Sequence, residues 1–155
     1  MQNDIKTLLS QVSEVQLSYK SKVKATDRPV VKNSHSVYQV LKDIWDDNTL
    51  ELSESFKILF LNRTNHIIGM YPLSTGGITG TVADPRLIFI AALKIAASGI
   101  ILAHNHPSGG LNPSRADIEL TEKIKMAGKL LDIAVLDHLI ITADAYYSFA
   151  DQGLL

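Results

Sequence analysis

The continuous apolar stretch from residue 87 to residue 103 constrains the fold of this chain more than any other segment. Its 17 residues approach the roughly 18 apolar residues that a membrane-spanning helix needs. However, Lys94 lies near its centre, Ser98-Gly99 interrupts it, and residues 84–86 (Asp-Pro-Arg) are typical of a helix start. We therefore interpret the stretch as a buried helix followed by a buried strand, and we expect no association with a membrane.

The chain alternates helical and strand-like patterns from residue 34 onward. Helices are expected over about 34–45, 85–97 and 114–131, and strands over 56–61, 67–73, 99–103, 133–141 and 146–149. The first two strands flank a turn at 62–65 and should form a hairpin, which makes a purely parallel sheet improbable. The alternation predicts an α/β fold with a mixed sheet.

Residues 1–33 differ in character from the rest of the chain. Val15–Tyr19 alternates like a short strand, and a basic run follows at Lys20, Lys22, Lys24, Arg28 and Lys32. This run is either an arm for nucleic acid or an acidic partner, or a solvated edge strand with its connector. We favour the second interpretation, because only five positive charges are involved and Asp27 lies among them. The chain is thus divided into an N-terminal segment, 1–33, and one domain, 34–155.

Charge and cysteine content exclude several classes of protein. The chain has 15 basic and 16 acidic side chains, which argues against a large cationic face for nucleic acid. It has no cysteine, which removes disulfide scaffolds, thiol nucleophiles and cysteine-ligated zinc sites. The chemistry that uses His, Asp, Glu, Ser and oxygen ligands remains open. The N-terminus lacks the basic start and long apolar core of a signal peptide, so we expect a cytoplasmic location.

The segment from residue 103 to residue 117 contains the residues best suited to chemistry. His104 and His106 follow the apolar strand 99–103, and side chains two apart on a strand point to the same side. Their Cα atoms should be roughly 7 Å apart, close enough for both rings to reach one ion. Ser114 opens the next helix, and Asp117 lies one turn into it. Two histidines, one carboxylate and an open position are typical of a catalytic zinc site.

Each of these residues also has a purely structural explanation. Two histidines at this spacing can form an ordinary polar end of a strand. Ser114 and Asp117 also fit a capping box, in which Asp117 would serve only the helix N-terminus. The combination of same-side histidines, a glycine-rich turn and a carboxylate in the first helical turn nevertheless favours metal binding.

The spacing of His104, His106, Ser114 and Asp117 resembles the JAMM metallopeptidase motif, with no gap or insertion. The flanking Pro and Gly residues, together with Leu136-Asp137-His138, make residues 35–155 similar to the RadC-like JAB branch of that superfamily. The resemblance implies a three-layer α-β-α sandwich of the cytidine-deaminase-like kind. It also implies one Zn²⁺ ion held by His104, His106 and Asp117.

The resemblance further implies an upstream glutamate that acts as general base. Glu51 and Glu54 are the candidates, and Glu54-Ser55-Phe56 matches the Glu-x-Phe pattern of the family whereas Glu51 does not. Glu54 would transfer a proton from water to the leaving amine, and Ser114 would donate a hydrogen bond to the developing oxyanion. The expected activity is zinc-dependent hydrolysis of an amide or isopeptide bond in a peptide or protein.

Three other functions remain as alternatives. The RadC name suggests DNA repair, although the chain has no helix-hairpin-helix glycine pattern. The string His-Asn-His at 104–106 suggests a metal-dependent nuclease, although nucleases named for that motif space the three residues widely. A non-catalytic interaction domain is the third alternative, and the intact set of predicted ligands argues against it.

Three further features carry weaker expectations. The amides of the Gly- and Thr-rich loop 74–81 could cradle a phosphate, but the loop lacks the spacing of a P-loop or a dinucleotide-binding fingerprint. We therefore expect a backbone-flexible loop beside the active site. His138 lies in an apolar strand and is expected to be a hydrogen-bonded interior histidine rather than a ligand. Asp137 is a candidate partner for one of the metal-binding histidines.

Overall fold

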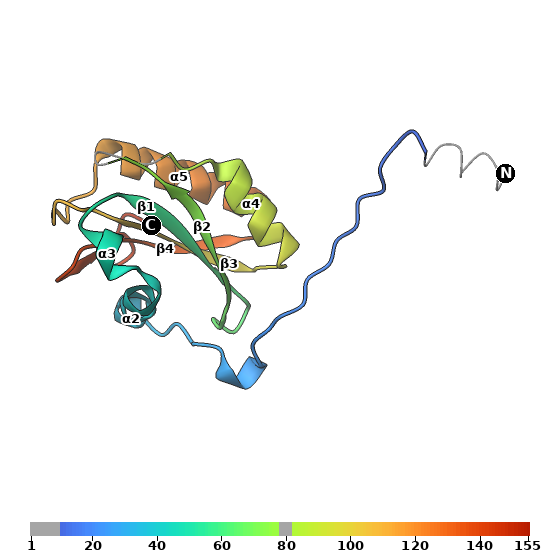
Figure 1. The fold of residues 1–155 in the computed structure, drawn as a ribbon, viewed down its shortest axis with the longest axis horizontal. Coiled ribbons are helices and arrows are strands. Elements are labelled where there is room, and N and C mark those ends of the chain that lie inside the picture. The colour runs from blue at the N-terminus through green and yellow to red at the C-terminus, as the bar shows by residue number, and fades with distance from the viewer. Residues whose placement is uncertain (1–9, 78–81) are drawn as a thin grey trace.

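A five-stranded sheet forms the centre of the computed structural model, which describes residues 10–77 and 82–155 (Figure 1). The strands are β1 (Ser55–Leu61), β2 (Ile67–Thr75), β3 (Gly99–Asn105), β4 (Ala134–Ile141) and β5 (Tyr146–Ser148). They lie in the order β2-β1-β3-β4-β5, with β3 and β4 parallel and the other neighbouring pairs antiparallel. The predicted hairpin and the predicted mixed sheet are both confirmed.

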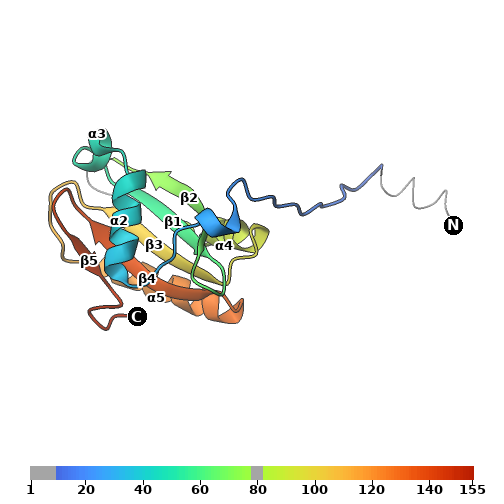
Figure 2. The ribbon, with the colours of Figure 1, turned by 90° about the horizontal axis from the view of Figure 1, so that it is seen from below.

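Helices cover both faces of the sheet. In Figures 1 and 2, helix α2 (Ser34–Ile44) lies on one face, and α4 (Pro85–Lys94) and α5 (Arg115–Leu130) lie on the other. Two short elements, a 3₁₀ turn η1 (Ala25–Asp27) and helix α3 (Asp47–Leu50), were not expected from the sequence.

Two apolar clusters, one on each face, hold the three layers together. Leu41 of α2 packs with Leu59 and Ile101 on one face of the sheet. Residues of α4 and α5 pack on the other face with Ile58, Phe60 and Leu102. Burial of such large side chains stabilises a fold by about 1.5–3 kcal/mol each. The three-layer α-β-α architecture is therefore confirmed.

The apolar stretch 87–103 divides as predicted into part of α4 and part of β3. Asp84 caps α4 by accepting a hydrogen bond from the backbone N–H of Arg86. The helix ends at Lys94, earlier than expected, because Ala96 adopts a left-handed conformation with φ 53°. All residues of β3 are buried. Among the described residues, no helix is long and apolar enough to cross a membrane.

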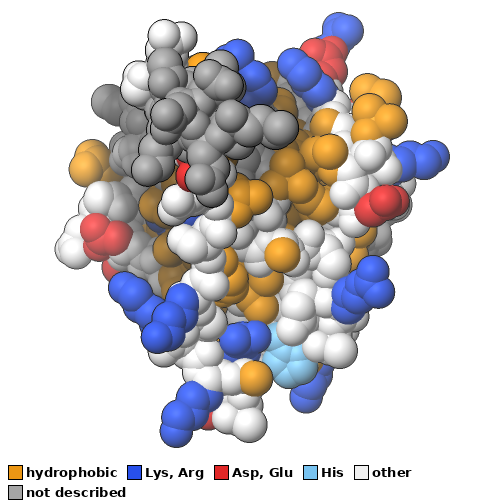
Figure 3. Space-filling view, turned by 90° about the vertical axis from the view of Figure 1, so that its right-hand side faces the viewer, with side chains coloured by type: hydrophobic (Ala, Val, Ile, Leu, Met, Phe, Trp, Pro, Cys, Tyr) orange, Lys and Arg blue, Asp and Glu red, His pale blue; other side chains and the backbone are white. Residues whose placement is uncertain are grey.

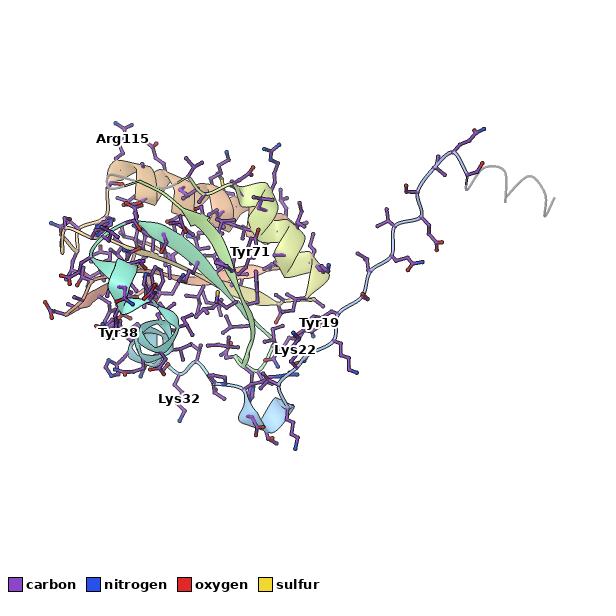
Figure 4. All side chains as sticks on the ribbon, viewed as in Figure 1. Tyr19, Lys22, Lys32, Tyr38, Tyr71 and Arg115 are labelled. Carbon is purple, nitrogen blue, oxygen red and sulfur yellow. The ribbon has the colours of Figure 1, made fainter. Side chains whose placement is uncertain are left out.

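The expected strand at residues 15–19 is not formed. The side chains of Val15 and Leu17 are 84% and 83% exposed, and the segment runs away from the sheet in Figure 1. The Tyr19 hydroxyl donates a hydrogen bond to the Ile68 carbonyl of β2, at 2.9 Å. An alternating sequence becomes a strand only where a neighbouring edge satisfies its backbone, so the interpretation as an edge strand is wrong. Lys22 and Lys32 are exposed to solvent (Figure 4).

An apolar groove of about 350 Å³ lies along β2 and α4 and is separate from the predicted site. Its lining includes Met70, Tyr71, Leu87 and Ile90, and none of the residues predicted to bind a metal. Figure 3 shows hydrophobic side chains gathered at the centre of one face of the molecule, with Lys and Arg side chains around them. The predicted metal-binding residues lie elsewhere, where β3 ends and α5 begins.

Candidate metal centre

The end of β3 directs His104 and His106 to the same place. His104 lies on the face of the sheet that packs against α4 and α5, and it is completely buried. The Nε2 atoms of the two rings are 3.0 Å apart. Asn105 points to the opposite face, where its amide bonds to Leu50 and Ser55. The arrangement predicted from strand alternation is thus present.

Helix α5 brings Asp117 to the two histidines. Ser114 caps the helix, and its backbone N–H and its hydroxyl each donate to Asp117 Oδ2 at 2.7 Å. The other carboxylate oxygen, Oδ1, lies 3.4 Å from His104 Nε2. Oδ2, the oxygen of the capping box, lies 3.8 Å from His106 Nε2, so Asp117 caps the helix and faces both histidines. The structural explanation and the ligand explanation are compatible.

The three side chains form a compact group that can hold a metal ion. One ligand atom from each of His104, His106 and Asp117 lies within 4.8 Å of the others. Two nitrogens bound to one tetrahedral zinc ion at 2.0–2.1 Å would be about 3.3 Å apart. The 3.0 Å between the ring nitrogens and the 3.4 Å from His104 to Asp117 are close to that separation. The distances and the chemistry of the donors fit a metal ion.

The glycine turn after β3 orients His106. Gly109 has φ +83°, a left-handed conformation that glycine adopts without strain, and it returns the chain toward the ring. The Gly110 carbonyl lies 2.7 Å from His106 Nδ1. Because a carbonyl only accepts, the His106 proton is on Nδ1, and Nε2 presents its lone pair to the group. This is the orientation that a metal ligand requires.

His104 is oriented by His138 rather than by Asp137. The Nδ1 atom of His104 lies 2.8 Å from Nε2 of His138. Asp137 instead accepts from the Ser148 hydroxyl at 2.6 Å and from the Ala150 backbone N–H at 3.0 Å. Alternation along β4 turns Asp137 away from the face that carries His138, so its prediction as a histidine partner is wrong. His138 is a hydrogen-bonded interior histidine, as expected.

Burial and hydrogen bonding shift the pKa values of three of these groups. Burial favours a higher pKa for the Asp117 carboxyl, but His104 and the hydrogen bonds from Ser114 outweigh it and lower the pKa. Burial lowers the pKa of His138 well below its ordinary value. Burial also raises the pKa of Asp137, although Ser148 partly opposes this. Asp117 is therefore ionised and His138 is neutral near pH 7.

Glu54 immediately precedes β1, the strand that neighbours β3. Phe56 of β1 pairs with His104, and continuing this register past the strand ends places Glu54 opposite His106. Residues two apart on a strand share a face, so the backbone places Glu54 on the side of the histidines. Within the described part of the chain, its carboxylate makes no ion pair with them. Glu51, the other candidate, is exposed at the C-cap of α3.

The loop that follows β2 supports the backbone of Glu54. Gly76 donates its backbone N–H to the Glu54 carbonyl at 2.8 Å, and the Glu54 N–H donates to the Gly77 carbonyl. Ser74 and Thr75 belong to β2 itself. Residues 78–81 lie outside the described residues, so the expectation of a flexible loop over 74–81 stays a prediction.

Two buried polar residues near the site were not singled out from the sequence. Thr121 is 2% exposed, and its hydroxyl lies 2.6 Å from His138 Nδ1. Asn105 is fully buried on the opposite face, where its amide holds Leu50, Ser53 and Ser55. Thr121 could have been found because it lies four residues after Asp117, on the same face of the helix. Asn105 could have been found because it is a polar residue at the end of an apolar strand.

Comparison with known proteins identifies the family. The family model of the RadC-like JAB domain matches residues 31–154. A UPF0758 protein of Flavobacterium johnsoniae is 56% identical over 101 residues, which are 65% of this chain and 44% of that protein. UPF0758 proteins of Porphyromonas gingivalis and Aquifex aeolicus are 45% and 36% identical over 83% and 81% of the chain.

These matches cover only part of the relatives. They span 56% of the Porphyromonas gingivalis protein and 52% of the Aquifex aeolicus protein, so the chain spans about half the length of the curated relatives it matches. The family model, in contrast, covers the whole sheet, both helical layers and the group formed by His104, His106 and Asp117. The chain belongs to the RadC-like JAB domain family.

Proposed function

We propose that this domain is a zinc-dependent hydrolase that cleaves an amide or isopeptide bond in a peptide or protein. The observation that carries the proposal is the convergence of His104 Nε2, His106 Nε2 and the Asp117 carboxylate at the junction of β3 and α5. Each of these atoms has an electron pair to offer, and three protein ligands leave a coordination position open for water or substrate.

Zinc suits this set of ligands. Imidazole and carboxylate are ordinary zinc ligands, and the chain has no thiolate to offer. The same donors bind manganese, iron or nickel, so identification of the metal requires a measurement. A bound zinc ion would lower the pKa of its water and polarise the carbonyl of the scissile bond.

The residues around the centre would move the protons. Glu54 would accept the proton of the attacking water and return it to the nitrogen of the leaving amine, first as base and then as acid. Its position directly before β1, the strand that pairs with β3, supports this role. The Ser114 hydroxyl donates to Asp117 Oδ2, so it must rotate before it can donate to a substrate oxygen. The Ser114 backbone N–H would continue to hold Asp117 after that rotation.

Metal content and peptide cleavage test the proposal together. Purified protein should contain about one zinc per chain by elemental analysis, and it should cleave members of a peptide library. Asp117→Ala should lose both the metal and the activity, whereas Asp43→Ala, an exposed change on α2, should lose neither. Full metal occupancy in Asp117→Ala would remove Asp117 from the set of ligands.

A DNA substrate tested in parallel separates the alternatives. Metal-dependent cleavage of DNA, with no cleavage of peptides, would refute the peptidase proposal in favour of a nuclease. DNA binding whose logarithm falls steeply with the logarithm of salt concentration would instead favour a DNA-binding role. A metal-free protein with no hydrolytic activity would favour an interaction domain.

A further inference from the structure

A chain of buried hydrogen bonds connects His104 to helix α5. His104 Nδ1 lies 2.8 Å from His138 Nε2, and His138 Nδ1 lies 2.6 Å from the Thr121 hydroxyl oxygen. The Thr121 hydroxyl in turn lies 2.6 Å from the backbone carbonyl of Asp117. His104 and His138 are fully buried and Thr121 is 2% exposed, so water does not compete for these bonds. The chain begins at one proposed ligand and ends at the backbone of another.

The chemistry of the terminal carbonyl determines the direction of every bond. The Asp117 carbonyl can only accept, so it takes the single hydroxyl proton of Thr121. The Thr121 oxygen must then accept from Nδ1–H of His138. A neutral imidazole carries one proton, so His138 Nε2 accepts from Nδ1–H of His104. In this direction His104 keeps its proton on Nδ1 and can offer Nε2, which faces His106 and Asp117, to a metal ion.

The opposite tautomer of His138 is incompatible with His104 as a metal ligand. With the proton on Nε2, His138 would donate to His104 Nδ1 and accept the Thr121 hydroxyl proton at its own Nδ1. The His104 proton would then lie on Nε2, where a metal ion needs a lone pair. Ring stacking fixes the geometry further, because His138 lies against Phe149 with centroids 4.6 Å apart.

We infer that His138 and Thr121 are positioning residues that keep the proton of His104 on Nδ1 and so aim a lone pair at the metal centre. The inference rests on the proposed function, since it assigns these residues a role in metal binding. It also explains why a polar pair occupies the interior between β4 and α5. Partners that orient a ligand in this way commonly change metal affinity by 10–100-fold when they are removed.

Two substitutions at position 121 provide a matched test. Thr121→Val removes the hydroxyl at nearly constant volume, whereas Thr121→Ser retains it. Zinc affinity, measured by competition with a chromophoric chelator, should fall 10–100-fold in Thr121→Val and stay within about threefold in Thr121→Ser. The melting temperature of each metal-free variant reports separately on folding. His138→Leu should lower the affinity at least as much, which provides a second route if a variant at 121 does not fold.

The direction of the bonds can be observed in the zinc-loaded protein. Long-range ¹H–¹⁵N correlation spectra of histidine-labelled protein should show both His104 and His138 protonated at Nδ1 in the wild type and in Thr121→Ser. A His138 ring protonated at Nε2, or an unchanged zinc affinity in Thr121→Val, would overturn the inference. A wild-type protein that binds no zinc would refute the proposed metal centre instead.

Discussion

Replacing Asn105 with alanine is expected to destabilise the domain by about 3–4 kcal/mol. The side chain is completely buried at the end of β3, on the face opposite to His104. Its Oδ1 accepts from the Ser55 backbone N–H at 2.8 Å and from the Ser55 hydroxyl at 3.3 Å. Its Nδ2 donates to the carbonyls of Leu50 and Ser53, at 2.7 and 2.9 Å. The amide therefore connects β3 to the end of α3, to the loop that follows it and to the first residue of β1.

The magnitude follows from these bonds. A buried hydrogen bond contributes a net 0.5–1.5 kcal/mol or about 1 kcal/mol on average, and three of the four bonds have good lengths. The alanine variant would leave the Ser55 N–H and two carbonyls without these partners, which adds a desolvation penalty that water entering the space would partly relieve. The sum is about 3–4 kcal/mol, a large part of the stability of an ordinary domain.

Urea unfolding followed by circular dichroism measures this effect. Asn112→Ala, an exposed change in the loop before α5, is the control and should shift the free energy of unfolding by less than about 0.5 kcal/mol. Because Ser55 follows Glu54 directly, we also expect Asn105→Ala to lower peptide hydrolysis more than it lowers zinc affinity. A loss of stability below 1 kcal/mol would refute the reasoning, since it would mean that the four bonds contribute almost nothing.

Three other predictions concern packing, catalysis and pH. Gly128→Ala should destabilise the domain by about 1–3 kcal/mol in thermal melts, although alanine favours helices, because a Cβ there would collide with the Ile133 carbonyl oxygen. Glu54→Gln should retain zinc but lose at least about 100-fold in peptide hydrolysis, whereas Glu51→Gln should remain near normal; the reverse result would transfer the role of base to Glu51. Burial lowers the pKa of His138, so below about pH 6.5 the unfolded state takes up a proton that the folded state does not. The metal-free protein should therefore lose up to about 1.4 kcal/mol per pH unit as the pH falls in urea titrations, and His138→Leu should reduce this slope.

The order and type of most elements could be predicted from the sequence because local periodicity determines them. The apolar stretch 87–103 divides into helix and strand, and its interruption at Ser98-Gly99 coincides with the start of β3. Helix ends were less predictable, because caps depend on side-chain geometry. Ser34 and Ser36 are both plausible caps of α2, yet Asn33 caps it and Ser36 completes the capping box.

The proposed ligands were also accessible from the sequence. His104, His106 and Asp117 lie within one strand–turn–helix unit, so short-range rules of alternation and helix capping bring them together. The spacing of the family motif reflects this local geometry. The same rules placed Asn105 on the opposite face, without indicating what it would contact there.

Contacts between distant segments were decided only by the tertiary structure. Alternation tells which face of a strand a residue occupies, but it does not tell which strand lies beside it. The parallel pairing of β3 with β4 brings His138 to His104, across 34 residues, and α5 brings Thr121 to His138. The orientation of the His104 ring depends on that sequence of contacts, because His138 bonds to its Nδ1 atom and Thr121 bonds to His138. The sequence alone therefore determined which groups could bind a metal, and the packing of β4 and α5 decided how one of them is oriented.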